Sequence, residues 1–285
     1  MTKLKIAIQK SGRLKEESLS LLKQCGIYID NGKDQLKAAS SNFPLEIYYL
    51  RNSDIPKYIE DGVVNLGIIG ENLLYELDSE LEVVRPLGYS KCRVSIAVPR
   101  EAEVQDVSYF EGKKIATSYP NTTRKYFQEK GIDTGIHTIS GSVEIAPNIG
   151  LADAICDIVS SGSTLFKNGL KETDVILESE AVLVQEPSPS NEITELIEQL
   201  DFRIKAVLNA KTSKYILMNV PNDKIKEVAD LLPVLRSPTI LPLAEEGWSS
   251  LHTVIQENDF WQVIDKLKIA GAEGILVSPI EKIIL

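Results

Sequence analysis

Residues 150–164, GLADAICDIVSSGST, combine carboxylates with small hydroxyl side chains in a pattern that packing alone does not explain. Small side chains let an anion approach the unpaired N–H groups at the start of a helix, where the helix dipole favours negative charge, and hydroxyls add further donors. A monophosphate is the anion that suits such a turn. The predicted phosphate-binding residues follow an apolar strand and are Ser160, Ser161, Gly162, Ser163 and Thr164.

Three carboxylates precede this turn. Asp153 and Asp157 would repel a phosphate that they touched, but one sugar away they would accept hydrogen bonds from the 2′ and 3′ hydroxyls of a ribose. Glu144 is a candidate to steady a cationic C1′ or to hold Mg²⁺, which takes one or two carboxylates together with phosphate oxygens. The pattern therefore predicts a ribose-5-phosphate site. The alternative is an ordinary helix capped by Ser160 or Ser161, with the aspartates in solvent and Glu144 in a first helical turn.

Positive charges lie in other loops that follow predicted strands. A guanidinium fork suits a polyphosphate, although a single basic residue in a loop is usually a solvated charge. Three loops that each supply a basic residue at a predicted strand end are harder to dismiss as solvated charges. Glu71, in a further polar turn, could receive a base or a ribose. The basic residues are Lys10, Arg13, Arg51, Lys91 and Arg93. No GxxxxGK[ST] or GxGxxG motif occurs, which disfavours a P-loop fold and a standard dinucleotide-binding fold.

The composition restricts the class of protein. A chain of 285 residues with 43% hydrophobic and 25% charged residues is typical of a globular protein of two or three compact units. A net charge of −10 argues against nucleic-acid partners, and no apolar run approaches the roughly 20 residues of a membrane helix. Three distant cysteines without a CxxC pair predict neither disulfides nor zinc, which favours the cytoplasm, and two histidines argue against a Ser-His-Asp mechanism.

An approximate internal repeat indicates how the candidate residues are positioned. Residues 5–27 and 114–132 each combine a short β-rich run, a polar loop, an amphipathic helix and a closing Gly-Ile. Residues 59–74 and 147–165 each combine a helix end, a glycine, a buried strand, a polar turn and a new helix. The repeat predicts two α/β lobes with parallel strands, and two unrelated α/β domains are the alternative. Because ligands of such sheets bind beyond the carboxyl ends of the strands, four loops are expected at one cleft: residues 9–14, 70–72, 117–123 and 160–164.

The domain boundaries follow from where this pattern changes. Residues 1–88 and 175–204 are predicted to form lobe I, with residues 175–185 as the strand that returns to it, and residues 89–174 to form lobe II. Residues 205–285 follow a β-α-β-β-α-β order, which is typical of a ferredoxin-like domain. This last domain has no acid-rich or hydroxyl-rich turn, so we expect it to be regulatory or oligomeric.

From about residue 4 to the C-terminus, the chain resembles the long form of the ATP phosphoribosyltransferase family. The resemblance is carried by IAIQKSGRL, DGVVNLGIIGENLL, ATSYP, GSVEIAPNIGLADAICDIVSSGSTL and SPTILPLA. It implies an α/β fold of two periplasmic-binding-protein-like lobes and a C-terminal ferredoxin-like, ACT-like regulatory domain. It also implies transfer of the 5-phosphoribosyl group of phosphoribosyl pyrophosphate to N1 of the adenine of ATP, the first step of histidine biosynthesis, with Mg²⁺ as cofactor.

The resemblance also implies roles for individual residues. Phosphoribosyl pyrophosphate would contact Asp153, Asp157, Ser160, Ser161, Gly162, Ser163 and Thr164. ATP would contact Lys10, Gly12, Arg13, Arg51, Glu71, Arg93 and Thr117. The catalytic residues would be Glu144, Arg13 and Tyr119, with Glu144 also a ligand of a Mg²⁺ ion that binds mainly through substrate phosphates. Inhibitory histidine would bind around Leu235, Ser237 and Thr239.

The resemblance further implies homodimers and homohexamers in the cytoplasm, with no nucleic-acid or membrane partner. Two rival functions remain. One is a non-catalytic solute-binding protein, which would share the two-lobed topology but needs no acid-rich phosphate turn. The other is a phosphoribosyltransferase that acts on another base, and only the loops of lobe I favour ATP over that alternative.

Overall fold

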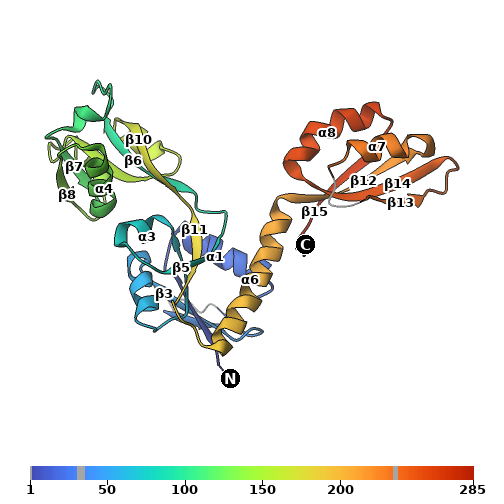
Figure 1. Ribbon diagram of the computed structural model, residues 1–285, viewed down its shortest axis with the longest axis horizontal. Coiled ribbons are helices and arrows are strands. Elements are labelled where there is room, and N and C mark those ends of the chain that lie inside the picture. The colour runs from blue at the N-terminus through green and yellow to red at the C-terminus, as the bar shows by residue number, and fades with distance from the viewer. Residues whose placement is uncertain (1, 31–35, 234–236) are drawn as a thin grey trace. The chain divides into compact units, whose positions relative to one another are not determined.

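The computed structural model describes residues 2–30, 36–233 and 237–285. The chain divides into two compact units: the first comprises Met1–Lys23 with Ile27–Glu198, and the second comprises Gln24–Gly26 with Gln199–Leu285 (Figure 1). Leu235, one of the residues expected to bind histidine, lies outside the described residues. Across the described ranges, no helix has the length and apolar character needed to span a bilayer.

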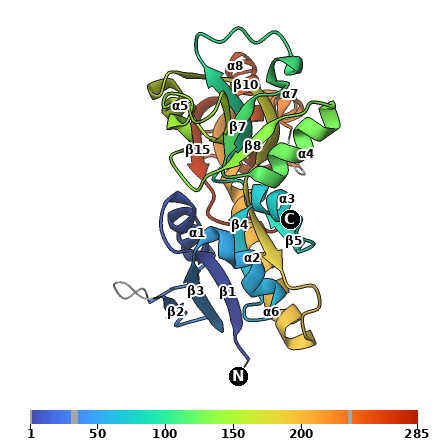
Figure 2. The same cartoon turned by 90° about the vertical axis from the view of Figure 1, so that its left-hand side faces the viewer.

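The first unit contains two sheets, each at the centre of a lobe. In the first lobe, β1 (Leu4–Gln9) lies between β3 (Leu45–Leu50) and β4 (Leu66–Gly70) and runs parallel to both. The strand β11 (Ala181–Gln185) pairs antiparallel with the other edge of β4. The sheet is completed by β2 (Lys37–Ala39) and β5 (Glu82–Pro86), in the order β2-β3-β1-β4-β11-β5 (Figure 2).

The sheet of the second lobe repeats this arrangement. Here β7 (Lys114–Thr117) lies between β8 (Gly135–Thr138) and β9 (Ala154–Val159) and runs parallel to both. The strand β6 (Cys92–Pro99) pairs antiparallel with the other edge of β9, and β10 (Leu170–Ser179) pairs with β6, which gives the order β10-β6-β9-β7-β8. The internal repeat of the sequence is thus a repeat of two α/β lobes with periplasmic-binding-protein-like topology.

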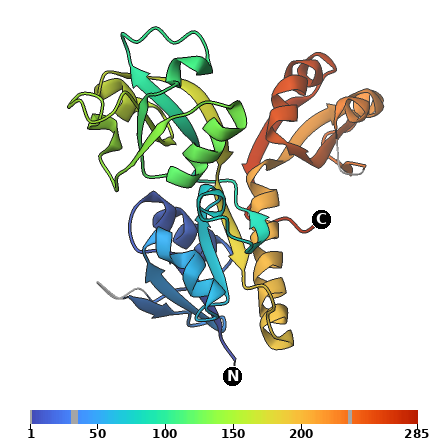
Figure 3. The same cartoon turned by 60° about the vertical axis from the view of Figure 1, so that its left-hand side comes forward.

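The chain passes between the lobes twice, which explains why neither sheet is fully parallel. The antiparallel strand beside β9 is β6, which belongs to the segment that leaves the first lobe. The antiparallel strand beside β4 is β11, which belongs to the segment that returns to that lobe. The two crossover segments run side by side (Figure 3): Leu87 N donates to the Ala181 carbonyl oxygen (2.9 Å) and Ala181 N to the Tyr89 carbonyl oxygen (3.0 Å). The expected parallel pairing is confirmed for β3-β1-β4 and for β8-β7-β9, whereas the strands that follow each crossing pair antiparallel.

The return to the first lobe lies later than the sequence predicted. Residues 175–179 belong to β10 of the second lobe, and β11 begins only at Ala181. The boundary placed at residue 175 is corrected to Glu180, the single residue between the two strands. Residues 175–185 form one continuous strand-like run, and no glycine or proline marks the change of sheet.

Helices begin where the parallel strands end. α1 (Arg13–Gln24) follows β1, α3 (Asn72–Leu77) follows β4, α4 (Pro120–Lys130) follows β7, and α5 (Ser163–Lys167) follows β9. α2 (Ile55–Glu60) packs so closely on β4 that a Cβ on Gly67 would lie 2.6 Å from Ile55 Cγ2, so this position requires glycine. The 3₁₀ helices of this unit are η1 (Asn52–Asp54), η2 (Val107–Phe110) and η3 (Val143–Ile145).

The second unit holds an antiparallel four-stranded sheet in the order β13-β14-β12-β15. Its strands are β12 (Ser213–Pro221), β13 (Thr239–Pro242), β14 (Trp248–Gln256) and β15 (Glu273–Pro279). Met218 and Leu251 of the sheet pack against Phe260 and other apolar residues of the helices in one core. The helices are α7 (Ile225–Leu231), preceded by η4 (Asn222–Lys224), and α8 (Glu257–Ile269), and the chain reaches this unit through α6 (Asn191–Lys211). The strand order confirms the ferredoxin-like domain.

Candidate active site

The predicted phosphate-binding turn joins β9 to α5. Gly162, immediately before α5, has a φ of +75°, a left-handed conformation that glycine adopts without strain. The turn borders a cavity of about 160 Å³, to which η3 contributes Glu144 and β9 contributes Asp157. The remaining lining residues are Ile158, Val159, Ser160, Ser161, Gly162, Ser163, Thr164 and Leu165. The structure therefore brings the predicted turn and two of its three associated acids together.

The backbone of this turn offers hydrogen-bond donors. Within the described parts of the chain, the N–H groups of Ser161, Gly162 and Thr164 donate to no protein acceptor, and Ser163 N makes only a long contact of 3.4 Å with Ser161 Oγ. The hydroxyl oxygens of Ser161 and Ser163 are 3.0 Å apart. An anion in the cavity would meet backbone N–H and hydroxyl donors together.

The two acids of the cavity interact electrostatically. Burial raises the pKa of Asp157, and the negative charge of Glu144 raises it further, while hydrogen bonds from Ile158 N (2.8 Å) and from Ser118 act in the opposite direction. Among the described residues, no group of three or more His, Cys, Asp or Glu side chains could enclose a metal ion. Two carboxylates beside a phosphate turn nevertheless fit Mg²⁺, which can take its other ligands from phosphate oxygens and water.

Tyr119 lies within the electrostatic influence of Asp157. Burial raises the pKa of Tyr119 most, and the charge of Asp157 raises it further. The phenol therefore stays protonated at neutral pH, where it can donate a hydrogen bond but cannot act as a base. Its backbone is fixed by Thr117 Oγ1, which accepts from Tyr119 N (2.8 Å), and by Thr123 Oγ1, which donates to the Tyr119 carbonyl oxygen (2.6 Å).

Thr117 and Asp153 do not line this cavity. Thr117 is fully buried, and its hydroxyl oxygen accepts the hydrogen bond from Tyr119 N in the turn before α4, while its contact with ATP stays a prediction. Asp153 precedes β9 and accepts a 2.8 Å hydrogen bond from Lys114 N. Because a strand rises about 3.3 Å per residue, the length of β9 separates Asp153 from the turn by about 20 Å. Its expected contact with the ribose is therefore wrong, since the two aspartates lie toward opposite ends of one strand.

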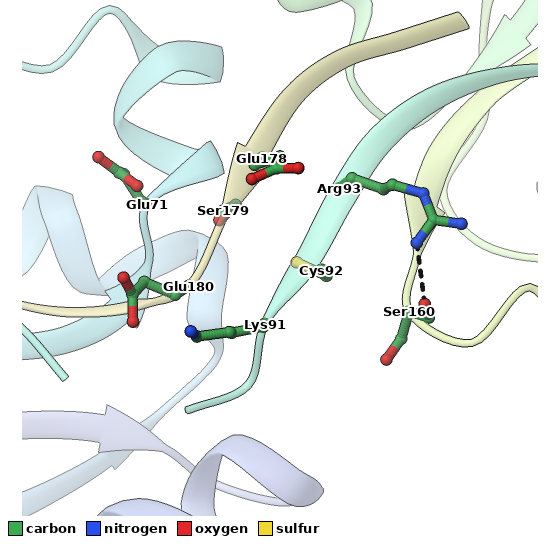
Figure 4. A pocket seen from close by; sticks show the side chains of 8 residues that line it. All are labelled: Glu71, Lys91, Cys92, Arg93, Ser160, Glu178, Ser179 and Glu180. Carbon is green, nitrogen blue, oxygen red and sulfur yellow. Dashed lines mark hydrogen bonds between the residues drawn. The ribbon is translucent and has the colours of Figure 1, made fainter. Parts of the chain in front are cut away.

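A second cavity of about 380 Å³ shares Ser160 with the first (Figure 4). It is lined from the first lobe by Glu71, from the crossover segments by Lys91 and Glu180, and from the second lobe by Cys92, Arg93, Ser160, Glu178 and Ser179. Figure 4 shows Glu71, Glu178 and Glu180 around this space. Three carboxylates here favour an uncharged part of a ligand that offers hydrogen-bond donors, such as a sugar or a base, over its phosphates.

Arg93, which lines the second cavity, forms hydrogen bonds with other groups of the protein. Its Nε and Nη2 donate to the two carboxylate oxygens of Glu172, each at 2.5 Å. Its Nη1 donates to the Ser160 carbonyl oxygen at 3.1 Å, the bond drawn in Figure 4. Because a peptide group is planar and trans, turning the Ser160 carbonyl toward Arg93 directs the N–H of Ser161 to the opposite side. The guanidinium fork of Arg93 thus supports the proposed phosphate-binding turn, and its contact with ATP stays a prediction.

The basic loops of the first lobe lie at the carboxyl ends of β1 and β3. Lys10 N donates to the Leu50 carbonyl oxygen (2.8 Å), which joins the loop of Lys10, Gly12 and Arg13 to the loop of Arg51. The side chains of Lys10, Arg13 and Arg51 are exposed. Arg13 Nη1 donates to Ser160 Oγ at 3.4 Å, so the loop of the first lobe reaches the turn of the second.

Sequence reasoning missed the contact between α3 and α4. Glu76 of α3 is 7% exposed, and its carboxylate accepts hydrogen bonds from Asn121 N (3.0 Å), Thr122 N (2.9 Å) and Thr122 Oγ1 (2.8 Å). On the same helix, Asn72 is bound to Ser179 at the end of β10. An acid in an amphipathic helix gives no sign in sequence that its partner lies in another lobe.

The residues expected to bind histidine lie in the second unit. Ser237 is exposed, and Thr239 begins the edge strand β13, where it is opposite His252 of β14. His252 Nδ1 is 2.7 Å from the Tyr215 hydroxyl oxygen.

Comparisons with known proteins agree on one family. The family model described as ATP phosphoribosyltransferase matches residues 51–206, and the model for the HisG C-terminal domain matches residues 210–282. A protein named ATP phosphoribosyltransferase from Cytophaga hutchinsonii is 56% identical over 99% of this chain and 99% of its own. A protein of the same name from Phocaeicola vulgatus is 52% identical over 99% of this chain and 100% of its own.

A solved structure supports the same relationship. A chain of the ATP phosphoribosyl transferase (HisG:HisZ) complex from Thermotoga maritima matches with a TM-score of 0.61 and 30% identity. The match covers 70% of this chain and 98% of that chain.

Proposed function

Because this chain belongs to the ATP phosphoribosyltransferase family, we propose that it transfers the 5-phosphoribosyl group of phosphoribosyl pyrophosphate to N1 of the adenine of ATP. The products are phosphoribosyl-ATP and pyrophosphate, and the reaction is the first step of histidine biosynthesis. The observation that carries the proposal at the level of the site is the cavity that unites Glu144, Asp157 and the turn of residues 160–164.

In this proposal the turn binds the 5-phosphate of the donor. The N–H groups of Ser161, Gly162 and Thr164 and the neighbouring hydroxyls supply the donors that a phosphate needs. Asp157 accepts hydrogen bonds from the ribose hydroxyls, because it is the aspartate that lies in this cavity. Asp153 takes no part.

ATP approaches from the first lobe. Lys10, Gly12, Arg13 and Arg51 surround its phosphates, where exposed cations lie at the carboxyl ends of two adjacent strands. Glu71 and the acidic lining of the second cavity receive its uncharged ribose or base. The contact of Arg13 with Ser160 supports this arrangement, since it brings the nucleotide loop to the edge of the donor site.

The chemistry requires charge stabilisation more than proton removal. N1 of adenine carries an available lone pair, so its attack on C1′ needs no base. Positive charge develops at C1′ as pyrophosphate leaves, and the carboxylates of Asp157 and Glu144 lie beside the proposed sugar site to stabilise it. Positioning of the two substrates can contribute roughly 7–11 kcal/mol of the rate enhancement, and exclusion of water protects the reactive sugar from hydrolysis.

We further propose that Glu144 holds Mg²⁺ together with the phosphates of the donor, with Asp157 as the second carboxylate of the same cavity. When bound, the ion would neutralise charge on the departing pyrophosphate. The remaining proposals are inhibition by histidine through the second unit, homodimers and homohexamers, and a cytoplasmic location.

The decisive experiment combines the purified protein with ATP, phosphoribosyl pyrophosphate and Mg²⁺. We expect a new near-ultraviolet absorbance from N1-substituted adenine and release of one pyrophosphate per product. Parallel reactions replace ATP by free adenine, guanine or orotate. Turnover of one of these in place of ATP would identify a different phosphoribosyltransferase, and binding of ligands without any turnover would identify a solute-binding protein.

A further inference from the structure

We propose that Glu76 is a positioning residue for this transfer: it joins the first lobe to the second and thereby holds Tyr119 beside Asp157. The inference rests on the proposed function, because it concerns the alignment of the two substrate sites. It concerns a residue that contacts neither proposed substrate.

The contact consists of four hydrogen bonds between two helices of different lobes. The Glu76 carboxylate accepts from Asn121 N (3.0 Å), from Thr122 N (2.9 Å) and from Thr122 Oγ1 (2.8 Å). The Glu76 carbonyl oxygen accepts from Asn121 Nδ2 at 2.9 Å. Both helices follow strands whose carboxyl ends form the proposed site, since α3 follows β4 and α4 follows β7.

The residues at the start of α4 supply no acidic cap for this helix themselves. Tyr119 precedes α4 and makes no capping hydrogen bond with its side chain, Pro120 follows it, and the first turn contains no acid. The first N–H groups of a helix have no partner within the helix, and the helix dipole favours a negative charge beside them. Glu76 satisfies this end of α4 from the other lobe, with an arrangement of charge-assisted bonds that also compensates for burying the carboxylate.

The contact bears directly on groups of the proposed site. Tyr119 is adjacent to the helix start that Glu76 holds, and Thr123 Oγ1 of the same turn binds the Tyr119 carbonyl oxygen. At the other end of α3, Ser179 Oγ donates to Asn72 Oδ1 and accepts from Asn72 N, each at 3.0 Å. The helix that follows Glu71 is thus fixed at both ends, once to the last residue of β10 and once to the start of α4.

The test compares steady-state rates of transfer in the full-length wild type, Glu76→Gln and Glu76→Asp. Glutamine keeps the size of the side chain but turns an amide NH₂ toward N–H donors, and aspartate keeps the charge but is one methylene too short. Because small misplacements of reacting groups are costly, we expect kcat to fall about tenfold or more in both variants, with KM values for both substrates within about threefold of wild type. Glu80→Gln, at an exposed glutamate just beyond α3, serves as the control and should retain wild-type kinetics.

Hydrogen exchange measures the contact independently of activity. We expect faster exchange of the Asn121 and Thr122 amides in the Glu76 variants, with the amides of β1 and β9 unchanged. Should Glu76→Gln fail to fold, Thr122→Val, which removes only the hydroxyl donor, should lower kcat about threefold. Wild-type kcat in folded variants whose Asn121 and Thr122 amides exchange faster would overturn the inference. A wild type that makes no phosphoribosyl-ATP would instead reject the proposed function.

Discussion

Arg93 shows that a residue's chemistry can be anticipated while its partner is not. Its guanidinium is suited to two parallel hydrogen bonds with an anion, and it does make them, but with Glu172. Its third contact fixes the Ser160 carbonyl. At the scale of the residue, the guanidinium of Arg93 therefore orients the backbone of the proposed phosphate-binding turn.

Arg93→Lys tests this role. Lysine keeps the charge but cannot bind Glu172 with two parallel bonds and the Ser160 carbonyl with a third donor. We expect KM for phosphoribosyl pyrophosphate to rise about tenfold, the equivalent of about 1.4 kcal/mol, with a smaller effect on KM for ATP. Arg100→Lys is the matched control, because Arg100 Nη2 donates to the Phe166 carbonyl oxygen of the same lobe outside the turn. Equal effects of the two variants on initial rates would contradict the assigned role.

The raised pKa of Asp157 predicts that its carboxylate lowers the stability of the fold at neutral pH, although the proposed reaction needs it. Burial and the charge of Glu144 raise its pKa in the folded chain, so the folded state holds the proton more tightly than the unfolded state does. The free energy of unfolding therefore falls as pH rises from about 4, the ordinary pKa of aspartate, through the raised pKa of Asp157. Asp157→Asn should unfold at a higher temperature than wild type at pH 7, and this difference should shrink at pH 4.

The same variant should transfer the phosphoribosyl group at least about tenfold more slowly, because it lacks the carboxylate beside C1′. Thermal unfolding at both pH values and initial rates at pH 7 provide the measurements, with Asp133→Asn, at an exposed aspartate, as control. A lower unfolding temperature than wild type at pH 7 would show that Asp157 stabilises the fold and would refute this account.

At the scale of the element, the turn between β9 and α5 depends on one backbone conformation. Gly162 has a φ of +75°, and a Cβ placed there would meet no atom within 4 Å. A substitution is therefore opposed by the backbone conformation and not by crowding. Any relaxation of φ would displace the N–H groups of Ser161 and Thr164.

Gly162→Ala should cost roughly 1–2 kcal/mol of unfolding free energy and raise KM for phosphoribosyl pyrophosphate several-fold. The control is Gly112→Ala, where φ is +68° and a Cβ would also meet no atom within 4 Å, but which lies outside the proposed site. Chemical denaturation should show similar losses of stability in both variants, whereas only Gly162→Ala should change KM. Unaltered KM in Gly162→Ala would argue that the turn does not bind the donor.

Elements that repeat in sequence were predictable, and contacts between the repeats were not. The order of strand, polar loop and helix predicted both lobes, the turn at residues 160–164 and the ferredoxin-like domain, because these features depend on local periodicity and turn residues. The change of sheet at Glu180 and the capping of α4 by Glu76 depend on tertiary neighbours. Asp153 was misplaced because proximity in sequence does not indicate which end of a strand a residue occupies.

At the scale of the whole molecule, the second unit has its own sheet and core, which supports the proposal that it regulates the first unit instead of contributing to chemistry. We expect L-histidine to lower the initial rate of the full-length protein, with L-lysine as the control ligand. Thr239→Arg should weaken this inhibition about tenfold or more and leave the rate without histidine unchanged, because Thr239 lies on an exposed edge strand. Inhibition of equal strength in wild type and variant would reject Thr239 as part of the histidine site.

The exchange of strands between the lobes also determines the order in which the chain can fold during synthesis. β11 lies between β4 and β5, so β5 has no neighbour in its sheet until residues 181–185 arrive. One edge of β4 in the first lobe therefore stays unpaired while the chain is still being made. During this time the second lobe, whose strands span residues 92–179, is synthesised completely. Translation would complete the second lobe before the first, and a nascent chain arrested before Ala181 should expose that edge to chaperones.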